Sequence, residues 1–147
     1  MKLNECVYFL TTRLSRELKK LFDKRLEELS LTSSMWCVLM AVIENGEITQ
    51  KELSDILSIE GPTTTKIIDN LEKRGFIKRV PHETDRRAYK ISLTEKGKAI
   101  EKDIFKYGDC FMKDVKSSLT DKEKKELHKL LNKIYNNIKT IPSSSCY

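Results

Sequence analysis

A predominantly α-helical (α+β) fold with one β-hairpin near its middle is predicted by three features of this sequence. Apolar residues recur every three or four positions through long stretches at both ends of the chain, as in amphipathic helices. Residues 61–75 carry the start and stop signals of a short helix. Residues 77–93 hold two short segments of alternating apolar and polar side chains, which is the pattern of paired strands.

The first third of the chain predicts two helices. One should run from Asn4 to about Leu29, and its length predicts that part of its apolar face packs on a second subunit. Thr32 or Ser33 can cap the next helix, which should stop at residues 45–46, an Asn-Gly pair. Apolar positions are Val7, Leu10, Leu14, Leu18, Leu21, Phe22, Leu26 and Leu29 in the first helix, and Met35, Trp36, Val38, Leu39, Val42 and Ile43 in the second.

Two further short helices are predicted around residues 49–75. Thr49 and Glu52 match a capping box, in which each side chain satisfies a backbone donor at the helix start. Pro62 suits a first helical position and Gly75 the position just past a helix end. With Ile67, Ile68 and Leu71 as the apolar face of this second helix, its exposed first turn is expected to be Thr63, Thr64, Thr65 and Lys66.

A hairpin should follow this helix directly, with strands Ile77–Val80 and Ala88–Leu93. The connection between them is too long for a two-residue turn, so it should project as a loop. Residues 61–98 contain ten Lys and Arg against five Asp and Glu, so they hold +5 of the chain's net charge of +6. A helix followed by a basic hairpin is typical of a winged helix-turn-helix, whose helix enters the major groove of DNA while the hairpin reaches the minor groove.

The last third predicts two more long helices. Thr94 can cap a helix that runs to about Ser117, and Thr120 with Glu123 forms a second capping box. Pro142 should end the last helix and leave residues 143–147 loose. The apolar stripes of the long N- and C-terminal helices exceed what so small a winged domain covers, so these helices are expected to form a dimerisation lobe.

Composition narrows the function. A sequence pI near 9.1 favours a polyanionic partner, and double-stranded DNA is the leading candidate. No stretch has the roughly 20 apolar residues of a membrane span. The N-terminal residues lack the pattern of a signal peptide, so we expect a cytoplasmic protein without membrane contact. The four cysteines are dispersed and the two histidines stand apart from other ligands, so neither a metal nor another cofactor is expected.

The hairpin also carries a family signature. Asp85, Arg87, Leu93 and Thr94 resemble the D-x-R-x(5)-L-T wing motif of the MarR family of bacterial regulators, and residues 59–62 and 71–75 are similar to its SlyA-like branch. The resemblance covers nearly the whole chain. It implies one MarR-type domain over residues 1–147. Its parts are a DNA-binding lobe at 33–98, dimerisation helices at 1–30 and 99–141, and a tail at 142–147.

The resemblance also implies residue roles. The protein is expected to bind pseudo-palindromic operators as a homodimeric repressor, with Arg87 in the minor groove and Asp85 holding the wing tip. Gly61 departs from the family, since relatives often carry a polar residue there, so a weaker helix cap is expected. The expected contacts are Pro62, Thr63, Thr64, Thr65 and Lys66 on the recognition helix, and Lys78, Arg79, Asp85, Arg86, Arg87 and Lys90 on the wing.

Regulation has two candidate sites. By resemblance, a small aromatic acid can bind where Arg13, Arg16 and Trp36 are expected to lie, although a surface ion pair or a core indole is the ordinary explanation of such residues and is preferred. Cys6 lies near the start of the first helix, where some relatives carry an oxidant-sensing thiolate, but it is one or two residues out of that register. Two other functions remain open as alternatives: an oxidant-sensing regulator, and a winged protein-interaction module that does not bind DNA.

Enzyme activity is not expected. The sequence has no G-x-S-x-G motif, no glycine-rich phosphate loop and no H-E-x-x-H motif. His82 and His128 have no obvious partner for acid–base chemistry.

Overall fold

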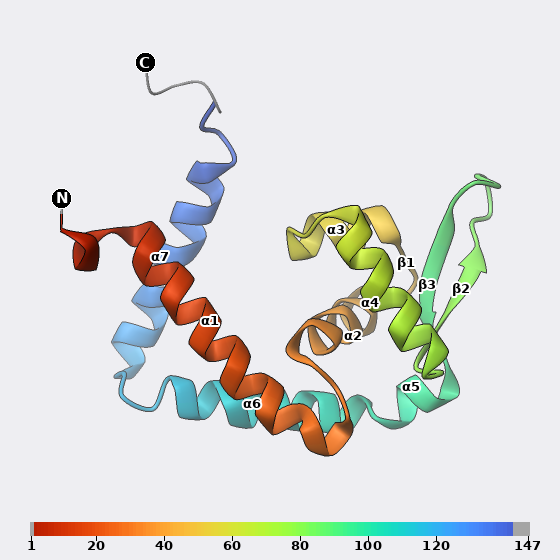
Figure 1. Cartoon of the computed structure of the whole chain (residues 1–147), viewed down its shortest axis with the longest axis horizontal. Coiled ribbons are helices and arrows are strands. Elements are labelled where there is room, and N and C mark those ends of the chain that lie inside the picture. Colours follow the sequence, from red (N-terminus) through yellow and green to blue (C-terminus); the bar gives the residue numbers. More distant parts are fainter. Residues whose placement is uncertain (1, 143–147) are drawn as a thin grey trace. The chain divides into compact units, whose positions relative to one another are not determined.

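The structure, a computed structural model, describes residues 2–142. It is mainly helical, with one antiparallel sheet of three strands in the order β1-β3-β2 (Figure 1). The chain divides into two compact units, Met1–Gly108 and Asp109–Tyr147. The elements are η1 Leu3–Glu5, α1 Val7–Leu26, η2 Glu27–Leu29, α2 Ser33–Asn45, β1 Ile48–Thr49, α3 Gln50–Leu57, α4 Gly61–Lys73, β2 Ile77–Pro81, β3 Tyr89–Leu93, α5 Glu95–Ala99, α6 Glu101–Val115 and α7 Asp121–Ile138.

The first long helix is shorter than expected. Cys6 adopts an extended conformation at the N-cap of α1, so the regular helix begins at Val7 rather than Asn4. At the other end the chain tightens into the 3₁₀ turn η2, and Ser30 then takes the left-handed conformation at φ 54°. The predicted helix over residues 4–29 is therefore correct in type but wrong at both ends, where helix limits are least fixed by sequence.

Helix α2 supplies much of the core of the first unit. The Thr32 side chain accepts a hydrogen bond from the Met35 backbone N–H, which fixes the predicted cap, and Gly46 follows the helix at φ 72°. Val38 and Leu39 are fully buried, together with Leu26 of α1, Leu53 of α3, Ile68 and Leu71 of α4, and Ile91 of β3.

Trp36 ties α2 to two other helices. Its indole Nε1 donates to the backbone carbonyl of Ile104 at 2.9 Å, and its ring packs edge to face against Phe22 with centroids 5.1 Å apart. A Cβ added at Gly108 would lie 2.5 Å from the indole, so only glycine lets α6 approach this closely. Because the indole packs and hydrogen-bonds in this way, the half-buried Trp36 holds α2 against α1 and α6.

Asp23 of α1 caps the neighbouring helix α2. Its Oδ1 accepts from the Ser33 backbone N–H at 2.6 Å, and Lys19 donates to Oδ2 at 2.7 Å. Burial of the carboxylate would raise the pKa of Asp23, but the hydrogen bonds from Lys19 and Ser33 outweigh it, so the pKa is lowered. The folded state therefore favours the charged form of this side chain.

Replacing Asp23 by Ala is expected to lower the free energy of unfolding at pH 7 by about 1 kcal/mol, the usual cost of a lost helix cap. A carboxylate with a lowered pKa stabilises the fold fully above the unfolded value of about 3.9, and this stabilisation is lost as the pH falls through the lower pKa of the folded state. The deficit should therefore shrink in urea unfolding measured near pH 3. Glu17→Ala on the same helix is the control, and an equal loss in both variants would contradict this role.

The helix-turn-helix consists of α3 and α4. The predicted capping box is present: the Thr49 side chain accepts from the Glu52 backbone N–H, and the Glu52 carboxylate accepts from the Thr49 backbone N–H. The Thr49 hydroxyl also donates to this carboxylate, which lowers the pKa of Glu52. Ser58 closes α3 in the left-handed conformation at φ 51°, and Gly75 follows α4 at φ 77°.

The hairpin has the predicted strands and one strand that the sequence did not predict. β2 and β3 pair antiparallel with Arg79 opposite Ile91. The two-residue strand β1 joins the free edge of β3, with Ile48 opposite Ile91. This third strand connects the start of α3 to the base of the hairpin.

Two helices, α5 and α6, follow the hairpin where one continuous helix was expected. The Thr94 side chain caps α5 as predicted, but the backbone leaves the helical conformation at Ile100 and α6 begins at Glu101. Gly97 of α5 lies against the hairpin, since an added Cβ would be 2.1 Å from the Phe76 carbonyl oxygen. The predicted continuous helix from Thr94 to Ser117 is therefore wrong.

The second unit contains α7, whose capping box between Thr120 and Glu123 is present as predicted. Not one residue of α7 is buried. The helix ends at Ile138, before Pro142, and the loose tail predicted for residues 143–147 lies outside the described residues.

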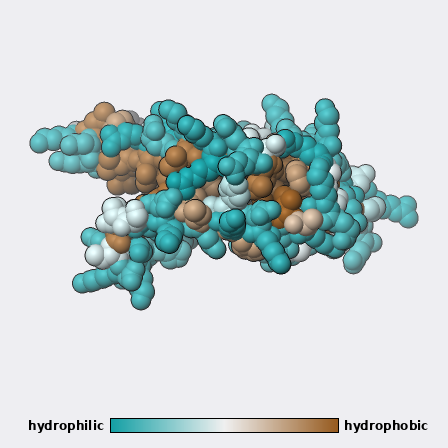
Figure 2. All heavy atoms as spheres, turned by 90° about the horizontal axis from the view of Figure 1, so that it is seen from below, coloured by the Kyte–Doolittle hydropathy of each residue, from teal (hydrophilic) through white to brown (hydrophobic). Residues whose placement is uncertain are grey.

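Several large apolar side chains are exposed. In the view of Figure 2, hydrophobic residues reach the surface in patches among hydrophilic ones. Most of the exposed apolar residues belong to the long terminal helices: Val7, Tyr8, Leu10, Leu14 and Leu21 on α1, and Leu127, Leu130, Leu131, Ile134, Tyr135 and Ile138 on α7. Across residues 2–142 no helix is by itself long and apolar enough to cross a membrane. One bent pair of helices, Val7–Leu29 with Ser33–Asn45, has the length and composition of a membrane span only when the two are taken together.

Candidate nucleic-acid interface

The candidate interface begins at the first turn of α4. Pro62 lies at the start of the helix, and Thr63 and Lys66 are exposed. Glu60 occupies the N-cap position, and its side chain makes no capping hydrogen bond. This agrees with the weak cap expected from Gly61, and it leaves backbone donors at the helix start open to another partner.

Thr64 does not belong to this exposed turn. Its side chain is fully buried, and its hydroxyl donates to the Glu60 carbonyl at 3.1 Å and lies 2.8 Å from the Ser54 hydroxyl of α3. The prediction that Thr64 contacts base edges is therefore wrong. Its position four residues before the buried Ile68 places it on the inner face of α4, where it binds α3 instead.

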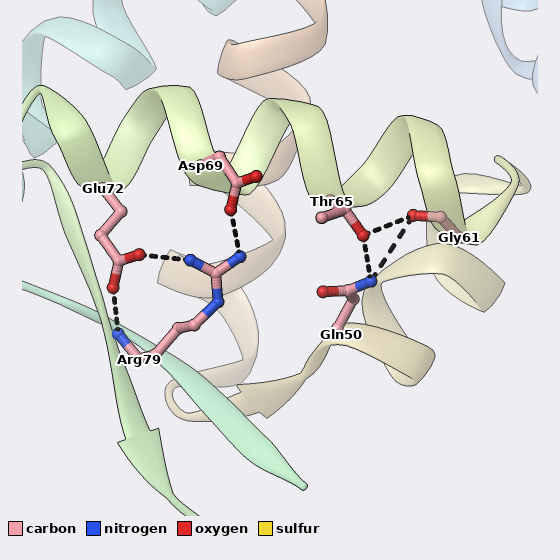
Figure 3. Close-up of polar contacts among 6 residues, drawn as sticks. All are labelled: Gln50, Gly61, Thr65, Asp69, Glu72 and Arg79. Carbon is pink, nitrogen blue, oxygen red and sulfur yellow. Dashed lines mark hydrogen bonds and ion pairs between the residues drawn. The ribbon is translucent and has the colours of Figure 1, made fainter.

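Thr65 is half-buried and is linked to α3 through Gln50. The Thr65 hydroxyl donates to the Gly61 carbonyl at 3.0 Å and accepts from Gln50 Nε2 at 2.7 Å. Gln50 Nε2 also lies 3.5 Å from the Gly61 carbonyl oxygen (Figure 3). Gln50 was not among the predicted site residues, because no sequence spacing signals a contact that depends on how α3 packs on α4.

Arg79 joins the wing to the recognition helix rather than facing outward. Its guanidinium forms ion pairs with Asp69 and Glu72 of α4, and its backbone N–H donates to Glu72 Oε1 at 3.1 Å (Figure 3). Burial alone would lower the pKa of Arg79, but the two carboxylates outweigh it and raise the pKa. The predicted phosphate contact of Arg79 is therefore corrected: its charge is used within the protein to fix β2 against α4.

The wing loop is shaped by side chains within it. Asp85 Oδ1 accepts from the Arg87 backbone N–H at 2.9 Å, which agrees with the predicted role of Asp85 at the tip. His82 Nδ1 lies 3.3 Å from the backbone nitrogens of Thr84 and Asp85. No spacing in the sequence predicts this contact of His82, since it depends on the folded shape of the loop.

The remaining basic residues of the wing differ in availability. Lys78, Arg86 and Arg87 are exposed. Lys90 is 23% exposed and lies 3.9 Å from Glu47 and 3.8 Å from Glu83, so its charge is shared with two carboxylates. The tip thus offers two adjacent free arginine side chains.

A hollow of about 270 Å³ lies between the start of α3 and the wing. Gln50 and Lys51 line it from α3, and Arg87 and Tyr89 line it from the wing. The start of α3 and the wing therefore border one hollow, and Gln50 also contacts the first turn of α4.

The predicted regulatory residues occupy separate places. Arg13 and Arg16 are exposed on α1, and the Arg13 guanidinium lies 5.6 Å from the centroid of the Phe9 ring. Cys6 is half-buried at the start of α1. Burial raises the pKa of Cys37, which disfavours the reactive thiolate form. Among residues 2–142 no group of three or more His, Cys, Asp or Glu side chains is arranged to hold a metal ion.

Thr64→Val is expected to lower the free energy of unfolding by about 1 kcal/mol, because the isosteric change removes a buried hydroxyl that binds Glu60 and Ser54. Because Thr64 faces α3, the sequence preference of bound DNA should not change. Thr63→Val, at an exposed neighbour, should leave stability within about 0.5 kcal/mol of wild type. Urea unfolding of both variants measures this, and a stability loss confined to Thr63→Val would contradict the assignment.

Comparison with known proteins identifies the family. Residues 29–88 match the MarR family. The HTH-type transcriptional regulator SarZ of Staphylococcus aureus (strain USA300) is 34% identical over 99 residues, which cover 67% of this chain and 67% of SarZ. The chain belongs to the MarR family. Its general function is therefore that of a DNA-binding transcriptional regulator.

Solved structures agree with the MarR fold. A mutant MarR from E. coli, complexed with operator DNA, is 26% identical to this chain and has a TM-score of 0.81, covering 91% of this chain and 98% of that one. The transcriptional regulator SlyA is 25% identical with a TM-score of 0.83, covering 90% and 93%. The predictions of the family and of the winged helix-turn-helix fold are therefore confirmed.

Proposed function

We propose that this MarR-family protein is a homodimeric repressor that binds a pseudo-palindromic operator. Each subunit would place the first turn of α4 in a major groove and the wing tip in the adjacent minor groove. The observation that carries the proposal is that Thr63 and Lys66 at the start of α4 and Arg86 and Arg87 at the wing tip are all exposed, while Arg79 joins the two elements through ion pairs with Asp69 and Glu72. Arginine at a narrow minor groove is favoured by the negative potential there.

The ion pairs of Arg79 support this geometry. They connect β2 to α4 at Asp69 and Glu72 and so hold the base of the wing against the recognition helix. With this spacing held, binding of α4 in the major groove also positions the wing at the adjacent minor groove. The contacts proposed for the complex are Pro62, Thr63, Thr65 and Lys66 from α4, and Lys78, Arg86, Arg87 and, more weakly, Lys90 from the wing.

A second copy of the chain is the proposed cover for the apolar faces of α1 and α7. Leu127, Leu130, Leu131, Ile134 and Ile138 recur at helical spacing along α7, and each is at least 40% exposed. A stripe of this kind on an amphipathic helix is stabilised by packing on another helix. A two-fold dimer would present two recognition helices to half-sites about 34–36 Å apart.

Release by a small aromatic acid is the regulatory part of the proposal. The cations of Arg13 and Arg16 are exposed on α1, where a carboxylate could reach them, whereas the Trp36 indole is engaged by Ile104 and Phe22. The acid would act by favouring a subunit arrangement that no longer fits both half-sites.

Selection of bound fragments from a random duplex pool tests the proposed function. The purified protein should enrich one pseudo-palindromic sequence, and affinity for it should fall steeply with salt because phosphate contacts displace counterions. Enrichment of no sequence, together with binding that is indifferent to salt, would instead favour a winged protein-interaction module.

A further inference from the structure

Gln50 lies outside the recognition helix but contacts its first turn. It is the first residue of α3, and its Nε2 lies 2.7 Å from the Thr65 hydroxyl and 3.5 Å from the Gly61 carbonyl oxygen. It also lines the hollow between α3 and the wing. One side chain therefore touches the helix that is proposed to enter the major groove and borders the hollow beside the wing.

The orientation of the Gln50 amide follows from the chemistry of its neighbours. A carbonyl oxygen such as that of Gly61 can only accept, and the Thr65 hydroxyl has already given its proton to this carbonyl at 3.0 Å. Both neighbours therefore require a donor, so the NH₂ group must face them. The Gln50 amide oxygen then points away from Thr65 and Gly61, as drawn in Figure 3.

This arrangement determines which part of Thr65 is available to DNA. Its hydroxyl donates to Gly61 and accepts from Gln50, so turning it toward a base would break two hydrogen bonds. With the hydroxyl engaged by Gly61 and Gln50, the methyl group is the part of the Thr65 side chain that makes no hydrogen bond and is left for an apolar contact. Thr64 is buried, so Thr63 is the threonine of this turn whose hydroxyl is exposed.

We propose that Thr65 reads a thymine of the operator through contact between its methyl group and the thymine 5-methyl group, and that Gln50 is the positioning residue that holds Thr65 in this orientation. The thymine methyl is the apolar feature of the major groove, and contact with an aliphatic side chain recognises it. The inference rests on the proposed entry of α4 into the major groove.

The first test removes the methyl group from the DNA. Each thymine of the selected half-site is replaced in turn by deoxyuridine, and affinity is measured for the wild-type protein. One position should lose about fourfold in affinity, which corresponds to the burial of about one methyl group. If no duplex is selected, the proposed function fails together with this inference. If a duplex is selected but it has no such thymine, the inference alone fails.

A matched pair of variants then assigns the contact to Thr65. Thr65→Ser keeps the hydroxyl and its hydrogen bonds but loses the methyl group, so it should bind the thymine and deoxyuridine operators equally. Thr65→Val keeps a methyl group and loses the hydroxyl, so it should still prefer thymine. The reverse pattern, with preference retained in Thr65→Ser and lost in Thr65→Val, would overturn the methyl contact and favour a hydroxyl contact.

Gln50→Met tests the positioning role, because methionine matches the length of glutamine and removes the amide donor. The preference for thymine over deoxyuridine should fall to less than half of the wild-type ratio, since the Thr65 hydroxyl then keeps only its bond to the Gly61 carbonyl and the side chain rotates more readily. Thermal unfolding should confirm that the variant is folded. A folded Gln50→Met protein with the wild-type thymine preference would overturn the role of Gln50.

Discussion

Replacing Leu131 and Ile134 of α7 by glutamate is expected to produce a monomer and to weaken operator binding by about 10²–10⁴-fold. Both side chains lie on the exposed apolar stripe of a helix in which no residue is buried. Two charges in a paired apolar surface would lose their hydration without gaining partners, which strongly disfavours association. The loss in affinity should be large because each half-site must then bind a separate protein molecule instead of the second subunit of one dimer.

The control adds the same two charges to the polar face of the same helix. Asn132→Glu with Asn136→Glu should remain dimeric and should bind the operator nearly as well as wild type, apart from a small loss from the changed net charge. Analytical ultracentrifugation and gel shifts on one protein preparation give both quantities. A Leu131→Glu, Ile134→Glu protein that stays dimeric, or a monomer with wild-type affinity, would refute the proposed assembly.

Arg87→Ala is expected to cost about 1–3 kcal/mol of operator binding per contact, the range for a good specific contact, without unfolding the protein. The Arg87 side chain is exposed at the wing tip, and the Asp85 carboxylate accepts from its backbone N–H. That backbone bond survives the substitution, so the loop should keep its shape. The lost free energy would therefore report on the guanidinium and not on the fold of the wing.

Lys20→Ala on α1 serves as the control for charge, since it removes one exposed positive charge far along the chain from the wing. Its effect on affinity should be small and should disappear at high salt, whereas that of Arg87→Ala should persist. Affinities that agree between folded Arg87→Ala and wild type would remove the wing from the binding mechanism.

Local signals were reliable in this sequence. The capping boxes at Thr49 and Thr120, the cap at Thr94 and the stop at Gly75 all occur in the structure where the sequence predicts them. The three threonine caps depend on side chains reaching backbone groups within a few residues, and the stop at Gly75 depends on a positive φ that glycine adopts readily, so each signal is local in the sequence. The family motif at the wing was equally readable, because its residues fall at fixed offsets.

Features that depend on packing between elements could not be predicted in the same way. Thr64 and Thr65 are adjacent polar residues at a helix start, and only contact with Ser54 and Gln50 shows that one is buried and the other tethered. The ion pairs of Arg79 likewise require β2 to lie beside α4. Sequence alone therefore predicts too many DNA contacts near the wing motif, because it does not show that a basic residue such as Arg79 is paired within the protein.

The central claim is that the dimer holds its two winged lobes at a fixed separation, which matches two half-sites one helical turn apart on the same face of the DNA. Inserting five base pairs between the half-sites of the selected operator tests this most directly, because it rotates one half-site to the opposite side of the duplex. Affinity for this duplex should fall to that of a single half-site, and ten inserted base pairs should weaken it less. Equal affinity for the original and five-base-pair duplexes would contradict the account.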